Sequence, residues 1–295
     1  MIKINGVTSN RQYYGRIPVF DYKKAMYRFE PLTFTNTSEG TQCISVFEHE
    51  DYKDSLVYSL DGGTTWQQIS QWNDDGDEGT YVGYIYVNSG GTAMFKTTVN
   101  HDPDWDYSYY NTRFGNGWGE GTFTVRGNPL SLHYTNYWNV FAYKDYEFHD
   151  LFFEFTGLTS AEGLVLDCDT VPDYCFERMF MWCYDLVTPP LIPATTIGAY
   201  GYHSMFENTG LTATPVIQNV SYTNGSFNAM FCDCHNLTQF TCLIEGDFTD
   251  LENEITNYWT RDVASEGTFY KSSNATYIMD SMDGIPEGWT VVDIS

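Results

Sequence analysis

The first half of the chain alternates short runs of β-branched and aromatic residues with turn residues. The clearest case is the run LVYSL at 56–60, which is followed by DGG and then by TTW at 64–66. Two glycines at such a turn supply positive φ angles, so a β-hairpin is predicted. Similar runs occur at 32–35, 44–47, 81–87, 92–99 and 121–125, with no long helical period between them. Residues 31–134 are therefore predicted to form a small antiparallel β-sandwich.

From residue 148 a second pattern repeats four times. Each unit has an aromatic residue, then Leu or Met three residues later and Phe four residues later, which is one face of a short helical turn. The units begin at Phe148, Phe176, Tyr202 and Phe227, which are 28, 26 and 25 residues apart, and each is followed by a leucine: Leu158, Leu186, Leu211 or Leu237. Repeats of this length predict a solenoid, in which each unit buries its apolar face against its neighbours.

The repeat pattern ends before the last stretch, 263–295. A solenoid needs an atypical terminal unit to cover its last open face, and Phe269, Trp289 and Val291 are predicted to form that cap. The chain therefore divides into four predicted segments: a basic segment at 1–30, the sandwich at 31–134, the solenoid at 135–262 and the cap at 263–295. The predicted fold class is mainly β with short helices.

Charge distinguishes the first of these segments from the rest. The chain has 39 acidic and 14 basic residues, a net charge of −25. Residues 1–30 hold six of the bases and two of the acids, a local balance of +4, and the remainder has a balance of −29. A basic segment on an acidic body is typical of docking to an acidic partner, such as another subunit. The alternative is a first strand pair whose bases face the acidic body.

The same imbalance excludes two classes of partner. A net charge of −25 repels both a phosphate backbone and an anionic membrane surface, so neither nucleic acid nor a lipid bilayer is expected to bind. The apolar runs are too short to cross a membrane, and the N-terminus lacks the apolar stretch of a secretory signal. The seven cysteines are an odd number, so they cannot all pair within the chain. Production in a bacterial cytoplasm is expected.

The repeat units resemble a known family. The pattern aromatic-x-x-Met-Phe-x-x-Cys-x-x-Leu-Thr, clearest in 176–187 and 227–238, resembles the BspA-like leucine-rich repeats. The tail VASEGTF…GIPEGWTV resembles the module that closes such repeats, and SLVYSLDGGTTW, YVNSGGTAMFKT and FTVRGNPLSLHY resemble the sandwich module that precedes them. The cysteine slot departs from the pattern at Phe155 and Thr209. The resemblance covers 31–295.

Proteins of this family face the outside of gut Bacteroidales cells or of their phages, and the resemblance implies adhesion without catalysis. The N-terminal segment resembles the attachment peptides of phage accessory proteins, which predicts docking to other virion proteins through Arg11, Tyr13, Tyr14, Arg16, Lys23 and Lys24. The resemblance thus implies a head fibre, decoration or tail-associated protein on the virion surface. A homo-oligomer is expected, and trimers are common among phage fibres. The alternatives are a bacterial surface adhesin, a carbohydrate-active enzyme and a purely structural decoration.

A loop rich in aromatic residues and glycine lies at 105–118. Rigid rings on a loop suit contact with sugars or with a protein partner. The residues predicted to bind a host glycan or surface protein are Trp105, Tyr107, Tyr109, Tyr110 and Trp118. The alternative is that half of these rings cover the end of the sandwich.

The patterns that could indicate a metal site or a catalytic site are weaker than the repeat pattern. Cys232, Cys234, His235 and Cys242 could hold zinc, but Cys234 occupies the repeat slot of Cys183, which favours a buried repeat cysteine. The acidic loops 73–78 and 102–106 do not complete a calcium-binding loop, so solvated carboxylates are favoured. No phosphate-binding glycine loop, zinc-protease motif or nucleophile elbow occurs. No metal, no cofactor and no enzymatic activity are therefore expected.

Overall fold

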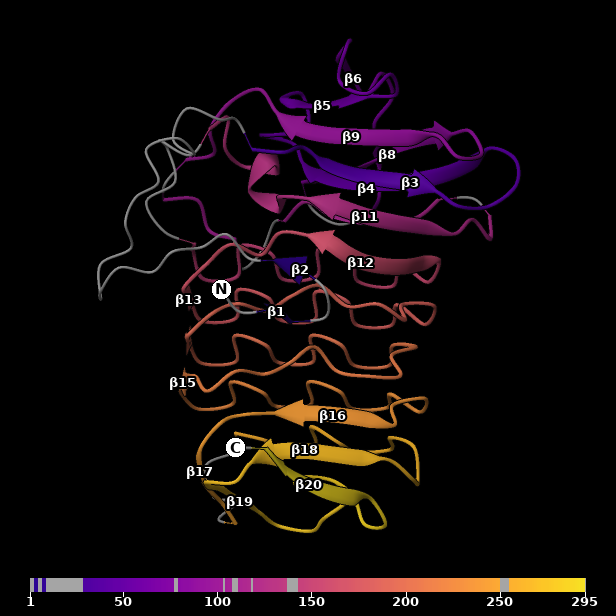
Figure 1. Ribbon diagram of the computed structural model, residues 1–295. Helices are drawn as coiled ribbons and strands as arrows, with labels where there is room; N and C mark the ends of the chain where they lie inside the picture. Colours follow the sequence, from indigo (N-terminus) through magenta and orange to yellow (C-terminus); the bar gives the residue numbers. More distant parts are fainter. Residues whose placement is uncertain are drawn as a thin grey trace.

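The computed structural model describes residues 3–4, 7–8, 29–76, 79–102, 104–107, 111–117, 119–136, 143–249 and 255–294. The described part is mainly β, which confirms that prediction: its strands form several sheets, and its one helix is the short 3-10 helix η2 (Pro129–Leu132). Figure 1 shows broad sheets at one end of the molecule and a stack of narrow coils at the other. Within the described residues, no helix is long and apolar enough to cross a membrane.

Two sheets make up the first end. A four-stranded antiparallel sheet has the order β10 (Arg113–Asn116), β4 (Gln42–His49), β8 (Thr80–Val87) and β7 (Asn73–Asp74). A six-stranded sheet has the order β12 (Leu158–Leu164), β11 (Phe123–Gly127), β3 (Leu32–Asn36), β9 (Thr92–Thr97), β5 (Leu56–Ser59) and β6 (Gln67–Gln68). β5 pairs with β6 in antiparallel register, which confirms a hairpin here, but its second strand is Gln67–Gln68. The predicted second strand, residues 64–66, lies in the turn instead. A separate antiparallel pair is formed by β1 (Lys3–Ile4) and β2 (Val7–Thr8).

Alternation of side chains builds the core between these two sheets. Along β9, Ala93, Phe95 and Thr97 are buried while their neighbours are partly exposed, because successive side chains of a strand point to opposite faces. The Phe114 ring centre lies 5.0 Å from that of Phe95 and 4.9 Å from that of Phe34. Phe114 belongs to β10 and the other two rings to β9 and β3, so the sheets face each other across an aromatic core.

The four sequence repeats occupy successive coils of the stack (Figure 1). Short parallel strands run along its sides in three groups: β13 (Thr170–Val171), β14 (Thr196–Ile197) and β15 (Ser221–Tyr222); β16 (Gln239–Cys242), β18 (Thr268–Ser272) and β20 (Thr290–Ile294); and β17 (Gly246–Phe248) with β19 (Ala275–Tyr277). The first coil joins the sheets directly, because β12 pairs in parallel with β11. One cluster of buried side chains runs through both ends of the molecule.

The predicted short helical turns are absent from the described residues, and a chain of tight turns takes their place. Backbone φ is positive at Tyr146, Asp150 and Glu154, and the same spacing of four recurs in the following units. The Asp150 N–H donates to Glu177 O of the next coil at 3.1 Å, whereas the Phe153 N–H donates back to Asp150 O at 3.0 Å. In an α-helix all of these backbone N–H and carbonyl groups would form hydrogen bonds within the helix. Here alternate N–H groups bind the neighbouring coil, which offsets the cost of the left-handed residues.

One glycine in this series gives a direct test of how the coils pack. Gly225 has φ +65°, and a Cβ atom there would lie 2.4 Å from Cε1 of Tyr200 in the preceding coil. Gly62 has φ +70° with nothing within 4 Å of such an atom. We expect Gly62→Ala to lower the free energy of unfolding by about 1 kcal/mol through the backbone alone, and Gly225→Ala to lower it by about 1–3 kcal/mol more through the clash. Urea unfolding measures both losses; equal values would contradict the close approach of Tyr200.

Stacked phenylalanine rings run through the coils. Phe180 lies between Phe152 and Phe206, with ring centres 5.2 and 5.4 Å away, and Phe206 lies 5.6 Å from Phe231. The ring of Phe206 is within 4° of parallel to both of its neighbours. All four rings are fully buried. The residues of the sequence repeat therefore recur at equivalent places in the structure.

A second column of rings links the coils to the sheets. Phe148 stacks on Phe176 of the next coil at 6.1 Å and on His133 at 5.0 Å on its other face. His133 lies 4.6 Å from His101, which in turn lies 3.6 Å from Tyr52. Tyr52 and His101 belong to the sheet end of the chain. One continuous stack therefore crosses the junction between the two ends.

A fifth coil, which the sequence pattern missed, follows the four. The Ala229 N–H donates to Asn257 O at 2.7 Å, and φ is again positive at Tyr258 and Asp262. The positions equivalent to the motif residues are all buried and hold Thr256, Trp259 and Thr260. Two threonines replace the rings of the earlier units, so the aromatic signature is lost while the backbone pattern continues.

Two of the three predicted cap residues are buried. Phe269 and Trp289 lie in the core, whereas Val291 is 39% exposed on β20. β20 pairs in parallel with β18, and no described strand pairs with its other edge. Val291 therefore lies on the open last strand and does not belong to a buried lid.

Candidate binding site

Several of the residues predicted to bind lie outside the described residues. They are the docking residues Arg11, Tyr13, Tyr14, Arg16, Lys23 and Lys24, together with Tyr109, Tyr110 and Trp118 of the aromatic loop. Their role in binding stays a prediction. Of the two loop residues that the structure describes, Trp105 is partly buried and packs edge-on against Tyr52, with ring centres 4.8 Å apart.

Tyr107 corrects the prediction for this loop. It is only 2% exposed, and its ring stacks on His133 at 5.0 Å. The ring fills space beside the column of rings that crosses the junction, so burial of its apolar surface holds it inside. Tyr107 is therefore a core residue and offers no surface for a ligand.

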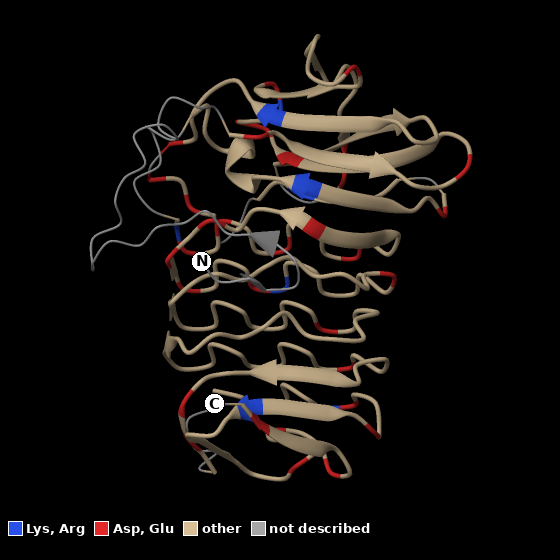
Figure 2. Cartoon of the chain, in the orientation of Figure 1, with Lys and Arg blue, Asp and Glu red and all other residues tan. Residues whose placement is uncertain are grey.

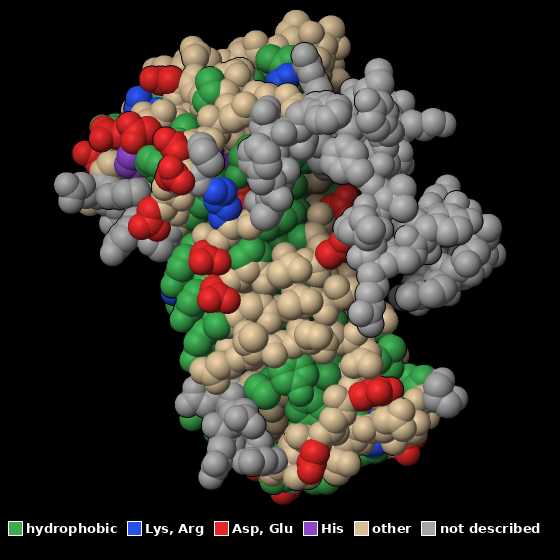
Figure 3. Space-filling view, turned by 90° about the vertical axis from the view of Figure 1, so that its left-hand side faces the viewer, with side chains coloured by type: hydrophobic (Ala, Val, Ile, Leu, Met, Phe, Trp, Pro, Cys, Tyr) green, Lys and Arg blue, Asp and Glu red, His purple; other side chains and the backbone are tan. Residues whose placement is uncertain are grey.

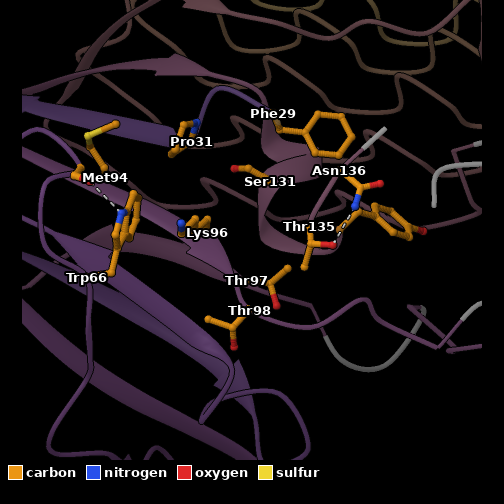
Figure 4. Close-up of a pocket in the computed structure, with 12 residues that line it drawn as sticks. Phe29, Pro31, Trp66, Met94, Lys96, Thr97, Thr98, Ser131, Thr135 and Asn136 are labelled. Atoms are coloured by element: carbon orange, nitrogen blue, oxygen red, sulfur yellow. Dashed lines mark hydrogen bonds between the residues drawn. The ribbon is translucent and has the colours of Figure 1, made fainter. Parts of the chain in front are cut away.

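A cavity of about 570 Å³ lies on the outer face of the six-stranded sheet. Its walls come from separate elements: Trp66 from the turn between β5 and β6, Lys96 from β9, and Tyr134 and Asn136 from the segment after η2 (Figure 4). Lys96 follows the buried Phe95 in β9, so it projects from the side of the sheet that faces away from the aromatic core.

Trp66 and Lys96 form one wall of this cavity. The Trp66 Nε1–H donates to Gly63 O at 3.0 Å, which fixes the indole against the turn. Gly63 has φ +85°, a conformation that glycine adopts without strain. Lys96 Nζ lies 3.9 Å from the centre of the Trp66 ring, a cation–π contact. The turn thus places an aromatic face and an ammonium group side by side.

Polar groups of the segment that follows η2 form the opposite wall. Asn128 caps η2, because its Oδ1 accepts the Leu130 N–H at 2.9 Å. The next turn is held by Thr135, whose Oγ1 donates to Asn100 Oδ1 at 3.0 Å and accepts from Asn136 Nδ2 at 3.2 Å. Hydroxyl and amide groups therefore face the indole and the ammonium group across the cavity (Figure 4).

The sequence did not indicate these residues, because the cavity joins segments that are far apart in the chain. Trp66 was recognised only as a strand residue of the hairpin, and Lys96 only as part of a strand. The alternation along β9 could have shown that Lys96 points outward. Only the fold shows that Asn136 lies opposite them.

A second cavity of about 390 Å³ lies at the C-terminal end of the stack, beside Arg261, Met282 and Glu287. Its described lining contains no aromatic ring. Arg261 is already engaged, because its Nη2 donates to Asp233 Oδ2 at 3.0 Å and its Nε lies 3.6 Å from Asp262 Oδ2. This cavity therefore offers less to a ligand than the first.

Two buried carboxyl groups have raised pKa values, but neither lines a described cavity. Burial raises the pKa of Glu147 to about 8 and lowers the pKa of His133 to about 3. Glu147 Oε1 lies 3.3 Å from His133 Nδ1, and Glu147 Oε2 accepts the Lys144 N–H at 2.9 Å. At neutral pH this contact joins a protonated carboxyl to a neutral imidazole. Burial also raises the pKa of Glu48 to about 7, where its Oε2 accepts from Thr112 Oγ1 at 2.6 Å.

The cysteines considered for zinc do not converge on one point. Cys234 Sγ donates to the Phe206 carbonyl at 3.0 Å, and Cys183 Sγ donates to the Phe152 carbonyl at the same distance in an earlier coil. Cys242 lies buried on β16. The interpretation of Cys234 as a buried repeat cysteine is therefore confirmed.

Glu207, Cys232 and Asp233 lie close enough to share an ion, with ligand atoms within 4.8 Å of one another. Their existing partners argue against one. Cys232 Sγ donates to Asp233 Oδ2 at 3.3 Å, and Arg261 Nη2 donates to the same oxygen at 3.0 Å. Burial raises the pKa of the Cys232 thiol, whereas a metal binds the thiolate. The arginine charge also opposes a cation, so the cluster does not fit a metal.

The chain matches no family model, no curated protein and no solved structure. The arguments for its function are therefore the resemblance carried by its repeats, its charge, its stacked coils and the larger of the two cavities.

Proposed function

We propose that this protein is a non-enzymatic accessory protein of a phage particle, either a head fibre, a decoration or a tail-associated protein. In this proposal the two facing sheets are a β-sandwich, residues 135–262 form a BspA-like leucine-rich-repeat solenoid, and residues 263–295 form its C-terminal cap. The basic segment 1–30 anchors the chain to other virion proteins, and the acidic body is displayed towards the surface of the host.

The observation that carries this proposal is the continuous stacking of the coils. Each coil binds the next through backbone hydrogen bonds, such as Phe152 N–H to Met179 O and Phe180 N–H to Met205 O, both 2.9 Å. Repeats that contact only their neighbours form elongated bodies with a long side surface. The ring column also crosses into the sheets, and coils and sheets share one cluster of buried side chains. Such a body suits spacing and display.

The distribution of charge supports display towards a partner other than nucleic acid. Figure 2 shows acidic residues at many turns of both the sheet end and the coils, and few basic residues in the described part of the chain. Five of the bases stand over aromatic rings: Lys53, Lys96, Arg113, Arg178 and Arg261. Figure 3 shows acidic side chains gathered at the sheet end of the face that it presents. The excess of acids repels a phosphate backbone.

Three alternatives make different predictions. A bacterial surface adhesin would lie in the cell envelope and not on a particle. A carbohydrate-active enzyme needs two carboxyl groups that face each other across the sugar, and the described lining of the larger cavity contains no carboxylate. A purely structural decoration would strengthen the particle without affecting adsorption to the host.

Locating the protein on particles tests the proposal. Antibodies against the full chain are applied to purified particles of the phage that encodes it and viewed by electron microscopy. We expect label on the particles, and we expect the added free protein to slow their adsorption to host cells. Label confined to the bacterial envelope would contradict a virion role, and unchanged adsorption of particles that lack the protein would favour pure decoration.

Charge reversal in the N-terminal segment tests the anchor. We expect Lys23→Glu with Lys24→Glu to lower incorporation into particles by about tenfold or more, because oppositely charged surfaces guide docking. The matched control is Lys53→Glu with Arg178→Glu, which changes the net charge equally on the body. Quantitative blotting of purified particles gives the incorporated amount. Equal incorporation of both variants would show that these lysines do not dock the protein.

A further inference from the structure

We propose that the strand side of the middle coils is a contact surface for a second copy of this chain. The strand side is the part of each coil that follows its repeat leucine, namely residues 187–193, 212–218 and 238–243 in three successive coils. The contact concerns the purified protein as well as any particle, so it does not depend on the virion role. Charge, exposed apolar surface and the spacing of the coils support it.

The middle of the stack is almost free of charged residues. Of the 39 acidic and 14 basic residues of the chain, only Glu207 and Asp233 fall between residues 186 and 244. Both lie in the tight turns of the repeat motif, where Glu207 follows Phe206 and Asp233 has positive φ, and not in the strand side. Figure 2 shows β16, which belongs to this side, without a charged residue, whereas β12 and β18 each carry one. An uncharged side therefore lies within a chain of net charge −25.

This distribution of charge favours a second copy as the partner. Two copies that approach each other through acidic surfaces repel each other. The strand side of the middle coils places no carboxylate against another, so two copies can meet there without this repulsion. A basic partner would gain more from the acidic surfaces of the chain. The cores of protein interfaces are likewise depleted in charged residues.

Apolar side chains are exposed on this side. Val187 and Leu191 are 51% and 60% exposed. Leu186 and Ile192, which flank them in the sequence, are buried, because successive side chains of an extended chain point to opposite faces. The equivalent outward positions of the next two coils hold Thr212, Val216, Thr238 and Thr241. Exposed apolar groups beside uncharged polar ones are typical of a surface that binds another protein.

The repeat gives this side a shape that matches a copy of itself. Ala213 pairs with Gln239 in parallel, and the Thr238 N–H donates to Thr212 O at 3.0 Å. Strands paired in this way lie ~4.8 Å apart, so rows of side chains recur at one spacing along the stack. A second copy has rows at the same spacing, and the rows of one copy can fit between those of the other over several coils. A partner without the repeat has no such match.

The size of the uncharged area sets the expected strength of the contact. Three coils ~4.8 Å apart, with about six residues of ~3.3 Å in each, cover roughly 14 by 20 Å. A stable complex buries ~800 Å² on each partner, so we expect weak and concentration-dependent association in solution. Copies anchored side by side would meet at a much higher effective concentration.

Sedimentation of the full chain at increasing concentration tests the proposal. We expect monomers at about 10 µM and reversible association towards about 1 mM, the range of weak complexes. Raising the NaCl concentration from about 0.05 M to about 0.5 M should strengthen this association, because salt screens the repulsion between acidic copies. Docking of the basic segment 1–30 on the acidic body of another copy would weaken with salt instead. A chain that stays monomeric at the highest concentration in high salt, or that associates only in low salt, would overturn the proposal.

Charged substitutions then locate the contact. Val187→Glu and Leu191→Glu each put a carboxylate on the strand side and should weaken association by about tenfold or more, because like charges at an interface repel each other. The matched controls are Val99→Glu and Leu60→Glu, at positions of the sheet end that are 46% and 45% exposed. They change the net charge equally and should associate like the original chain. Circular dichroism confirms that each variant is folded.

The outcomes separate this contact from the virion role. Association that survives Val187→Glu and Leu191→Glu, or that the controls weaken equally, would show that the copies meet elsewhere and would overturn the proposal. Particles that carry the protein while the purified chain stays monomeric would leave the virion role intact and remove this contact. A purified chain that associates through the strand side but is absent from particles would keep the contact and remove the virion role.

Discussion

Phe206→Ala is expected to lower the free energy of unfolding by about 3–5 kcal/mol, the range for a fully buried phenylalanine. Phe206 is fully buried between Phe180 and Phe231, at ring-centre distances of 5.4 and 5.6 Å, so its removal leaves a cavity in the middle of the stack. Because each coil is stabilised by its neighbours, we also expect faster hydrogen exchange in the coils on both sides. Urea unfolding followed by far-UV circular dichroism measures the loss.

A matched aromatic substitution shows whether the inner column is responsible. Tyr200 stacks on Tyr174 at 5.1 Å in an outer column that is partly exposed. Tyr200→Ala removes a ring of similar size from the same coil and is expected to cost about 1–2 kcal/mol, because less surface is buried. Equal losses for Tyr200→Ala and Phe206→Ala would contradict the view that the inner column stabilises the stack.

The stability of the protein is expected to fall as pH rises from about 5.5 to 9. Burial raises the pKa of Glu147 from 4.5 to about 8, so the folded protein holds a proton that the unfolded chain releases. A tenfold difference in proton affinity between the folded and unfolded states is worth about 1.4 kcal/mol, which gives a loss on the order of 3 kcal/mol across this window. Glu48, with its pKa raised to about 7, acts in the same direction.

Two buried histidines act in the opposite direction at low pH. Burial lowers the pKa values of His101 and His133 to about 2 and about 3, so below pH 6.5 the unfolded chain takes up protons that the folded protein does not. Stability is then lost as pH falls. Together with the carboxyl groups, this gives a maximum of stability near pH 5.5. Unfolding free energies at pH 4, 5.5, 7 and 9 measure the curve.

Glu147→Gln isolates the carboxyl contribution. The amide has the shape of the protonated acid and no charge, so we expect stability close to that of the original chain at pH 5 and a gain on the order of 3 kcal/mol at pH 9. The control is Glu154→Gln on an exposed turn of the first repeat. If Glu147→Gln keeps the pH dependence of the original chain, Glu147 does not release its proton on unfolding.

Much of the fold was predictable from local patterns. The glycine-containing turn after residues 56–60 predicted the hairpin of β5 and β6, because glycines adopt the positive φ angles of such a turn. Its length was not predicted, because the second strand begins at Gln67 and not at residue 64. The motif spacing placed Phe152, Phe180, Phe206 and Phe231 at equivalent sites, because a repeat can bury its apolar face only against its neighbours.

The conformation of the motif segment was predicted wrongly. Apolar residues at i, i+3 and i+4 share one face in a helix, and the same three positions of each unit also share one face in a chain of turns. The positive φ angles at Tyr146, Asp150 and Glu154 could not be predicted from the residue types, because residues other than glycine rarely adopt them. Only the neighbouring coil, which accepts the alternate N–H groups, makes this conformation favourable.

The fifth coil and the aromatic loop 105–118 also show what a local sequence pattern could not predict. Trp259 occupies one motif position of the fifth coil, and threonines occupy the other two. The backbone conformation of the repeat therefore continues into this coil, although the aromatic pattern that identifies the earlier units does not. Tyr107 looked like a surface residue beside charged and polar neighbours, yet stacking on His133 makes it part of the core. The sequence of a loop does not by itself predict which of its aromatic rings the rest of the fold will bury.

By itself the sequence determined the strand-rich composition, the repeat with its buried face and the separation of a basic segment from an acidic body. These properties follow from the spacing of residues along the chain or from a sum of charges, so the sequence shows them directly. Tertiary structure decided which backbone conformation the repeat adopts, which rings are buried and where the larger cavity lies. Trp66, Lys96 and Asn136 come together only when distant segments pack, and no local interaction encodes that approach.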